Sequence, residues 1–218
     1  MQNLQTAFEV LKHGGAIIYP LLALALAALV VMLDKALVYR RHARLPDSLR
    51  ELVETYGFDW SELDRHLASL GPRNYFGRFF KVIMDNRTKP AWWVESRAGD
   101  EAQRIEKALG RGVWVLDTGV TAGPLLGLLG TILGMMQSFK LMGSDSLVNP
   151  TGVTAGVAEA LIATAVGLLI ALVALFGFNY LTRLQAQMLD EMERLGTRLV
   201  DHIRLDAQEA AAGRKAAA

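Results

Sequence analysis

Three long apolar segments constrain this chain more than any other feature of its sequence. They cover residues 16–39, 113–142 and 152–180. Each is long enough to cross a hydrocarbon core as a helix, which takes roughly 20 apolar residues. The chain is 52% hydrophobic, yet 21% of its residues are charged, and most of these lie outside the three segments. The pattern predicts an all-α membrane protein with three transmembrane helices.

The remaining segments predict how the rest of the chain is organised. Residues 1–15 form a short outer segment before the first span, and a polar loop at 143–151 joins the second span to the third. Residues 40–112 lack sustained period-2 alternation, so they predict helices broken by turn residues. Residues 181–218 are predicted to continue the third span as a helix that ends in a mobile tail. Two spans are therefore expected to extend into a helical region.

Turn residues divide the region between the first two spans into several helices. Short helices are predicted up to Tyr56, over Ser61–Leu70 and over Tyr75–Asp85. From Ala91 no proline occurs until Pro124, which predicts one long helix that enters the membrane as the second span.

The segment after the third span has an apolar face. Apolar residues recur there every three or four positions, at Leu184, Met188, Met192, Leu195, Leu199 and Ile203. Such a face packs either against its own chain or against another subunit.

Basic residues near the ends of the spans predict the orientation, because Lys and Arg accumulate on the cytoplasmic side. They follow the first and third spans and precede the second, whereas only Lys12 and Lys140 lie near the opposite ends. The N-terminus is therefore predicted outside and the C-terminus inside. A signal peptide cleaved near Ala25 is the alternative for the first segment. Its apolar run continues past that point to a basic flank, which favours a retained anchor.

Composition and motifs exclude several function classes. The net charge of +1 argues against a nucleic-acid-binding protein driven by bulk charge, and the absence of cysteine removes thiolate and cysteine-zinc chemistry. The four histidines are far apart, so no metal site is expected. The glycine runs match neither a Walker loop nor a nucleophile elbow nor a dinucleotide fingerprint. We therefore expect neither an enzyme nor a bound cofactor.

Small residues form matching stripes on the second and third spans. Such spacing lets helix backbones approach closely in lipid, which is a main source of helix association there. The predicted packing residues are Gly119, Gly123, Gly127, Gly130, Gly134, Gly156, Ala160 and Gly167.

Three polar residues interrupt these apolar spans. Counted from the interface aromatics Trp114 and Tyr180, Thr131 and Thr164 both stand about 25 Å from the cytoplasmic plane. Glu159 stands about 31 Å from that plane, near the outer mouth. It is either an interfacial carboxyl that reaches outer water or a group that exchanges protons within the membrane. One acid and two hydroxyls do not make a complete proton relay.

Two motifs resemble the ExbB/TolQ/MotA proton-channel family, and ExbB most of all. The first motif lies in the second span and comprises Leu116-Asp117-Thr118, Ala122-Gly123-Pro124-Leu125-Leu126-Gly127-Leu128-Leu129-Gly130-Thr131 and Gly134-Met135. The second motif lies in the third span and comprises Val157-Ala158-Glu159-Ala160-Leu161-Ile162-Ala163-Thr164-Ala165 and Gly167. TolQ usually has Ala-Pro-Gly where this chain has Thr154-Ala155-Gly156, and MotA has a fourth span that is not present here.

The resemblance implies a subunit of a bacterial inner-membrane motor. Such subunits form a ring, expected to be a pentamer, around the helices of a single-span partner, ExbD, which supplies a membrane aspartate. The motor energises a TonB-like transducer and, through it, outer-membrane transport. The family's functional polar residues fall here on Thr131, Glu159 and Thr164. The alternatives are a TolQ-like subunit of the Tol-Pal system and a membrane scaffold without proton conduction.

Overall fold

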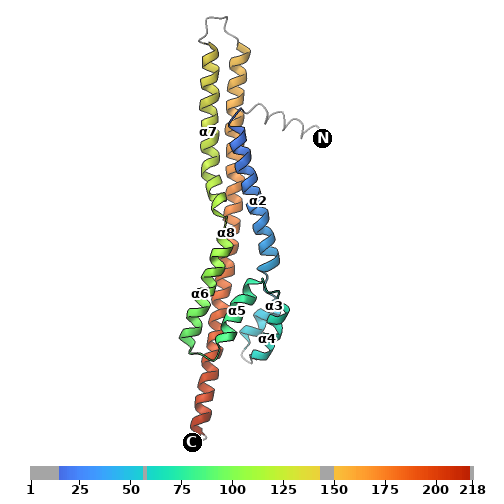
Figure 1. Cartoon of the computed structure of the whole chain (residues 1–218), viewed down its shortest axis with the longest axis vertical. Coiled ribbons are helices and arrows are strands. Elements are labelled where there is room, and N and C mark those ends of the chain that lie inside the picture. The colour runs from blue at the N-terminus through green and yellow to red at the C-terminus, as the bar shows by residue number, and fades with distance from the viewer. Residues whose placement is uncertain (1–14, 56–57, 143–149, 217–218) are drawn as a thin grey trace. The chain divides into compact units, whose positions relative to one another are not determined.

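The computed structural model describes residues 15–55, 58–142 and 150–216. All regular elements within these ranges are α-helices (Figure 1). They are α2 Ile18–His42, α3 Asp47–Glu54, α4 Trp60–Ser69, α5 Tyr75–Asn86, α6 Ala91–Gly110, α7 Trp114–Met142 and α8 Pro150–Ala216. Among the described residues, three helical stretches are long and apolar enough to cross a membrane: α2, the α6–α7 stretch and α8. These findings confirm the predicted all-α fold with three spans. The loop predicted at 143–151 falls almost wholly outside the described residues.

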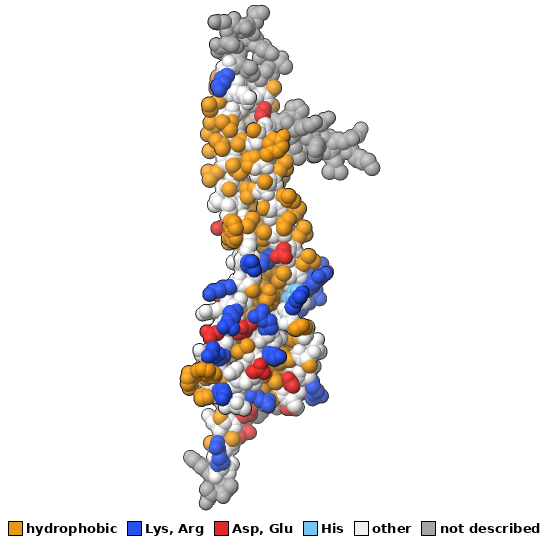
Figure 2. Space-filling model, in the orientation of Figure 1, with side chains coloured by type: hydrophobic (Ala, Val, Ile, Leu, Met, Phe, Trp, Pro, Cys, Tyr) orange, Lys and Arg blue, Asp and Glu red, His pale blue; other side chains and the backbone are white. Residues whose placement is uncertain are grey.

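The chain divides into two compact units. The first unit comprises Met1–Leu33 and Gly112–Leu181, and the second comprises Asp34–Arg111 and Thr182–Ala218. Hydrophobic side chains cover most of the visible surface of the first unit, whereas charged side chains are spread over the second unit (Figure 2). Large apolar residues remain exposed in the first unit, for example Leu125 at 66% and Phe176 at 68%. In water this exposure would be costly, so the surface is suited to lipid.

The second unit has its own hydrophobic core. The amphipathic helix α5 buries one face, made of Phe76, Phe79, Phe80 and Ile83. The apolar face of α8 packs into the same cluster, with Met188, Met192, Leu195, Leu199 and Ile203 all at most 6% exposed. From Met188 onward the apolar residues after the third span therefore pack against their own chain, which was one of the two alternatives, while Leu184 is half-buried outside this core.

Side-chain caps define where the short helices begin. The Asp59 carboxylate accepts a hydrogen bond from the Ser61 backbone at 2.9 Å and starts α4. Asn74 starts α5 in the same way, through Gly77 at 3.1 Å, and its amide also donates to the Arg44 carbonyl at 2.9 Å. These caps satisfy backbone groups that a helix terminus leaves unpaired. The short helices predicted over 61–70 and 75–85 are confirmed. Helix α3 ends at Glu54 and Thr55 is extended, so the prediction of a helix up to Tyr56, a residue outside the described ranges, places the end too late.

A charged network joins α3 to α8 in the second unit. Arg50 Nε lies 2.6 Å from Glu191 Oε1, and Arg194 binds both Glu191 and Glu54. Desolvation alone raises the pKa of Glu191, but hydrogen bonds from Arg50 and Arg194 outweigh it and lower that pKa below its ordinary value. The network therefore holds Glu191 in its ionised form.

The continuous helix predicted from Ala91 into the second span is interrupted. Helix α6 ends at Gly110, Arg111 is extended, and Gly112 adopts a φ of +85°, which favours glycine. Near this break the ammonium of Lys35, which is only 4% exposed, donates to the Ala108 carbonyl at 3.3 Å. The donor satisfies one of the carbonyls that the end of α6 leaves without a helical partner. The third span, in contrast, continues without a break as α8 to Ala216.

Candidate functional site

The predicted packing residues lie where α7 and α8 meet. A Cβ added to Gly167 would lie 2.5 Å from the Gly123 carbonyl oxygen and 3.0 Å from Gly127 Cα. The other packing residues also face across: Gly119 meets Ala174, Gly130 meets Ala163, Gly134 meets Ala160, and Gly156 meets Ser138. The two helix backbones therefore touch over several turns, and no larger residue fits at the centre of the contact.

The close approach brings the two predicted threonines together. Thr131 Oγ1 and Thr164 Oγ1 are hydrogen-bonded to each other across the helix pair. The Thr164 hydroxyl also lies 3.0 Å from the Gly127 carbonyl oxygen, and the Thr131 hydroxyl lies 3.2 Å from the Ala160 carbonyl oxygen. Both side chains are half-buried. The pair forms a small polar centre in an apolar contact.

The donors and acceptors of the two threonine hydroxyls determine which groups the pair can bind. Each hydroxyl carries one proton and two acceptor lone pairs, so the two protons are shared among the pair and the neighbouring carbonyls. A protonated carboxylic acid that approached could donate to a free lone pair of either oxygen. A carboxylate would instead need a hydroxyl proton and would have to displace a backbone carbonyl. The pair can therefore respond to the protonation state of a carboxyl group, although it carries no acid itself.

Glu159 does not join this pair. It lies five residues before Thr164, about 7.5 Å along the helix axis, and projects about 140° away around it. Its half-buried carboxyl lies instead against Gly15, just before α2. Glu159 and Gly15 line a cavity of about 340 Å³, and Gln137 and Lys140 of α7 also line it. The structure thus puts the three predicted polar residues in two places.

Sequence reasoning missed a third hydroxyl at the α7–α8 contact. Ser138 is 3% exposed, and its Oγ donates to the Gly134 carbonyl at 3.0 Å while facing Gly156 of α8. The signal was available, because Ser138 lies four residues after Gly134 and seven after Thr131 and so falls on the same stripe.

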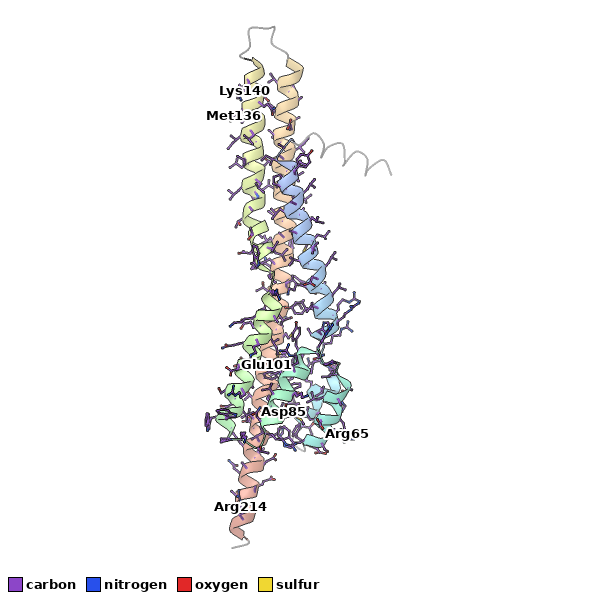
Figure 3. All side chains as sticks on the ribbon, in the orientation of Figure 1. Arg65, Asp85, Glu101, Met136, Lys140 and Arg214 are labelled. Carbon is purple, nitrogen blue, oxygen red and sulfur yellow. The ribbon has the colours of Figure 1, made fainter. Side chains whose placement is uncertain are left out.

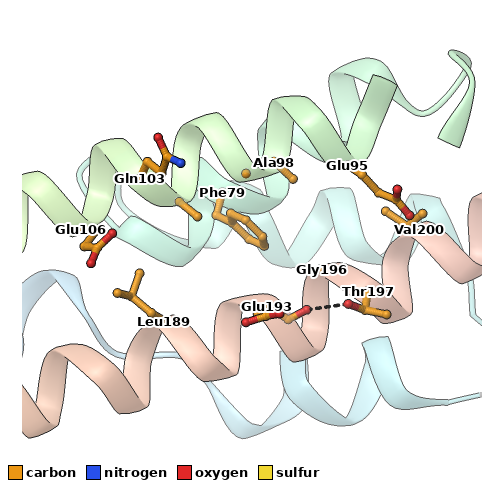
Figure 4. A pocket seen from close by; sticks show the side chains of 12 residues that line it. Phe79, Glu95, Ala98, Gln103, Glu106, Leu189, Glu193, Gly196, Thr197 and Val200 are labelled. Atoms are coloured by element: carbon orange, nitrogen blue, oxygen red, sulfur yellow. Dashed lines mark hydrogen bonds between the residues drawn. The ribbon is translucent and has the colours of Figure 1, made fainter. Parts of the chain in front are cut away.

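The second unit contains a larger cavity that none of these residues lines. It measures about 490 Å³ and lies between α6 and α8, with Phe79 at its apolar base (Figure 4). Glu95, Glu106 and Glu193 contribute carboxylates to its edge, and Arg204 binds Glu95. The predicted polar residues all belong to the first unit, so the candidate site is built on the threonine pair and on Glu159.

Comparisons with known proteins identify the family to which this chain is similar. The family model of the MotA/TolQ/ExbB proton channel family matches residues 73–194. A protein named ExbB-like 1 from Synechocystis sp. is 32% identical over 205 residues, covering 88% of this chain and 76% of its own length. An ExbB homolog from Methanothermobacter thermautotrophicus is 24% identical, with 86% and 67% coverage. The biopolymer transport protein ExbB of Aquifex aeolicus is 34% identical over 92 residues, with 42% and 62% coverage.

Proposed function

The chain belongs to the MotA/TolQ/ExbB proton channel family as a multi-pass inner-membrane protein, and from this premise we propose that it is the ExbB-like subunit of a proton-driven motor. In this proposal several copies form a ring, a pentamer as in the family, around an ExbD-like single-span partner. The partner supplies a membrane aspartate, and the motor energises a TonB-like transducer. The N-terminus is periplasmic and the C-terminus is cytoplasmic.

The observation that carries the proposal is the threonine pair at the α7–α8 contact. Its oxygens can accept a hydrogen bond from a protonated carboxyl group, whereas a carboxylate must compete with the carbonyls of Gly127 and Ala160 for the hydroxyl protons. A carboxyl group carried by the partner would therefore bind differently before and after it releases its proton. That difference supports a role in coupling proton transfer to movement of the partner.

Replacing Thr131 and Thr164 with Val tests this role, because valine keeps the shape and removes the hydroxyl. Side-chain hydrogen bonds between membrane helices contribute about 0.6 kcal/mol on average, so we expect both variants to assemble normally. We expect them to lose proton-driven work, with Glu159→Ala impaired as well. The measurements are the mass of the purified ring and proton flux through proteoliposomes that contain the chain with its single-span partner.

Thr121→Val provides the matched control. Thr121 lies on the same helix, but it is exposed, and its hydroxyl donates to the Thr118 carbonyl of α7 itself at 3.0 Å. This variant should keep full flux. Full activity of the Thr131→Val, Thr164→Val double variant would contradict the proposal and return the protein to the scaffold class. Function with Tol-Pal partners alone would favour the TolQ-like alternative.

A further inference from the structure

The cavity beside Glu159 is formed within a single copy of the chain. Residues Gly15 to Ile17 close one side of it, α7 contributes Leu133, Gln137 and Lys140, and α8 contributes Glu159. Lys140 lies close to the end of the described part of α7 (Figure 3). All of these residues belong to the first unit. The cavity therefore brings together parts of all three spans around one carboxyl group.

Gly15 determines how closely the start of α2 approaches this carboxyl. A Cβ on Gly15 would overlap with Glu159 Oε1 and lie 2.9 Å from Glu159 Cδ. Gly15 also has a φ of +68°, a conformation in which a side chain is strained. The carboxyl is the far end of a flexible side chain and can move aside, so the backbone conformation is the constraint that favours glycine. In the structure the backbone before α2 lies directly against the carboxyl group.

The lining and the volume are suited to water. A buried water needs two to four polar partners and occupies about 30 Å³ in the liquid, so a cavity of about 340 Å³ holds several. The Glu159 carboxyl, the Gln137 amide and the Lys140 ammonium supply donors and acceptors. Gly15, Ala16 and Ile17 precede the helix, and backbone outside a helix at membrane depth is tolerated where it lines a protein or water cavity.

We propose that this cavity is a water-filled vestibule through which protons reach Glu159 from one side of the membrane, with Gly15 keeping it open. The inference rests on the proposed function, because it names the route by which the motor takes up protons. It adds Gly15, Gln137 and Lys140 to the residues that form the proton path. The ligand is water together with the protons that it carries.

Cysteine accessibility tests the vestibule directly, because the chain contains no cysteine. The protein is reconstituted with its partner, and a charged, membrane-impermeant methanethiosulfonate is added to each side in turn. We expect Gln137→Cys to react from one side only, at least tenfold faster than Leu26→Cys. Leu26 is the control because it is 63% exposed on α2 and does not line the cavity. Equal rates, or equal access from both sides, would overturn the vestibule.

Gly15→Ala, added to Gln137→Cys, tests whether the glycine keeps the cavity open. The added methyl group must displace the Glu159 carboxyl, so we expect the labelling rate to fall several-fold. An unchanged rate would show that Gly15 has no such role. The readout is reagent access rather than proton-driven work, so it does not depend on the threonine variants. If Gln137→Cys reacts rapidly while the Thr131→Val and Thr164→Val variants keep proton-driven work, only the proposed function is refuted. If Gln137→Cys reacts slowly while those variants lose proton-driven work, only the vestibule is refuted.

Discussion

Gly167→Ala tests the α7–α8 contact with the smallest possible change. The added Cβ would lie 2.5 Å from Gly123 O, 3.0 Å from Gly127 Cα and 3.2 Å from Gly127 N. All three are backbone atoms, which cannot rotate out of the way. To bring the shortest of these distances to 3.4 Å, the helices must separate locally by about 0.9 Å.

This separation has two consequences. Overpacking of this kind typically costs about 1–3 kcal/mol of stability. The Thr164 hydroxyl, one turn away, lies 3.0 Å from the Gly127 carbonyl oxygen. A shift of about 0.9 Å takes this distance to roughly 3.9 Å, beyond the range of a hydrogen bond. We therefore expect Gly167→Ala to weaken the helix contact and to impair proton-driven work together.

Gly99→Ala is the matched control, because it makes the same chemical change on α6 where a Cβ meets nothing within 4 Å. Replacing this exposed helical glycine should stabilise the protein by up to about 1 kcal/mol through helix propensity. The two substitutions should differ by about 1–3 kcal/mol in the free energy of unfolding. Thermal unfolding in mild detergent, followed by circular dichroism, measures the difference, and proteoliposome flux measures the work. Equal stability and equal flux would refute the close-packing argument.

Two further predictions concern orientation and pH. Cysteines placed at Ser144, which lies outside the described residues, and at Ser48 should label from opposite sides of the membrane, and labelling of both from the periplasm would contradict the proposed orientation. The pKa of Glu191 is lower in the folded protein than in the unfolded chain. Its carboxylate therefore stabilises the second unit at pH values above the unfolded-state pKa of this group, and the contribution is lost as the pH falls through the folded-state pKa. The melting temperature of wild type should therefore fall more steeply than that of Glu191→Gln between about pH 5 and pH 3, and parallel curves would count against the network.

The sequence predicts most of the fold because the relevant signals are periodic and long. Residues 113–142 and 152–180 are long apolar runs that need no tertiary information to be identified as helices. The spacing of Met192, Leu195 and Leu199 identifies the buried face of α8 equally well, since all three are fully buried in the second unit. Whether that face would meet its own chain remained open, because periodicity identifies a face and not its partner.

The features that escaped prediction depend on a single residue or on contact between distant segments. The chain contains 20 glycines, and nothing local distinguishes Gly112, which interrupts a helix, from Gly99, which lies inside one. Gly15 and Glu159 are far apart in sequence, and their contact depends on how the start of α2 approaches α8. Counting residues along each span gave Thr131 and Thr164 a common depth, yet it gave no information about which way their side chains face.

The division of the polar residues between two places argues that this chain does not complete a proton path by itself. Glu159 and Thr164 project about 140° apart around α8, and about 7.5 Å of helix separates them. A single hydrogen bond joins atoms about 3 Å apart, so a proton on Glu159 needs at least one intervening group to reach the threonine pair. The threonine hydroxyls already bond to each other and to backbone carbonyls, and they carry no acid that could hold the proton. A carboxyl group from another chain, placed between the vestibule and the threonine pair, would supply the missing step. The same geometry therefore motivates the proposed single-span partner. It also predicts that this subunit alone conducts protons poorly.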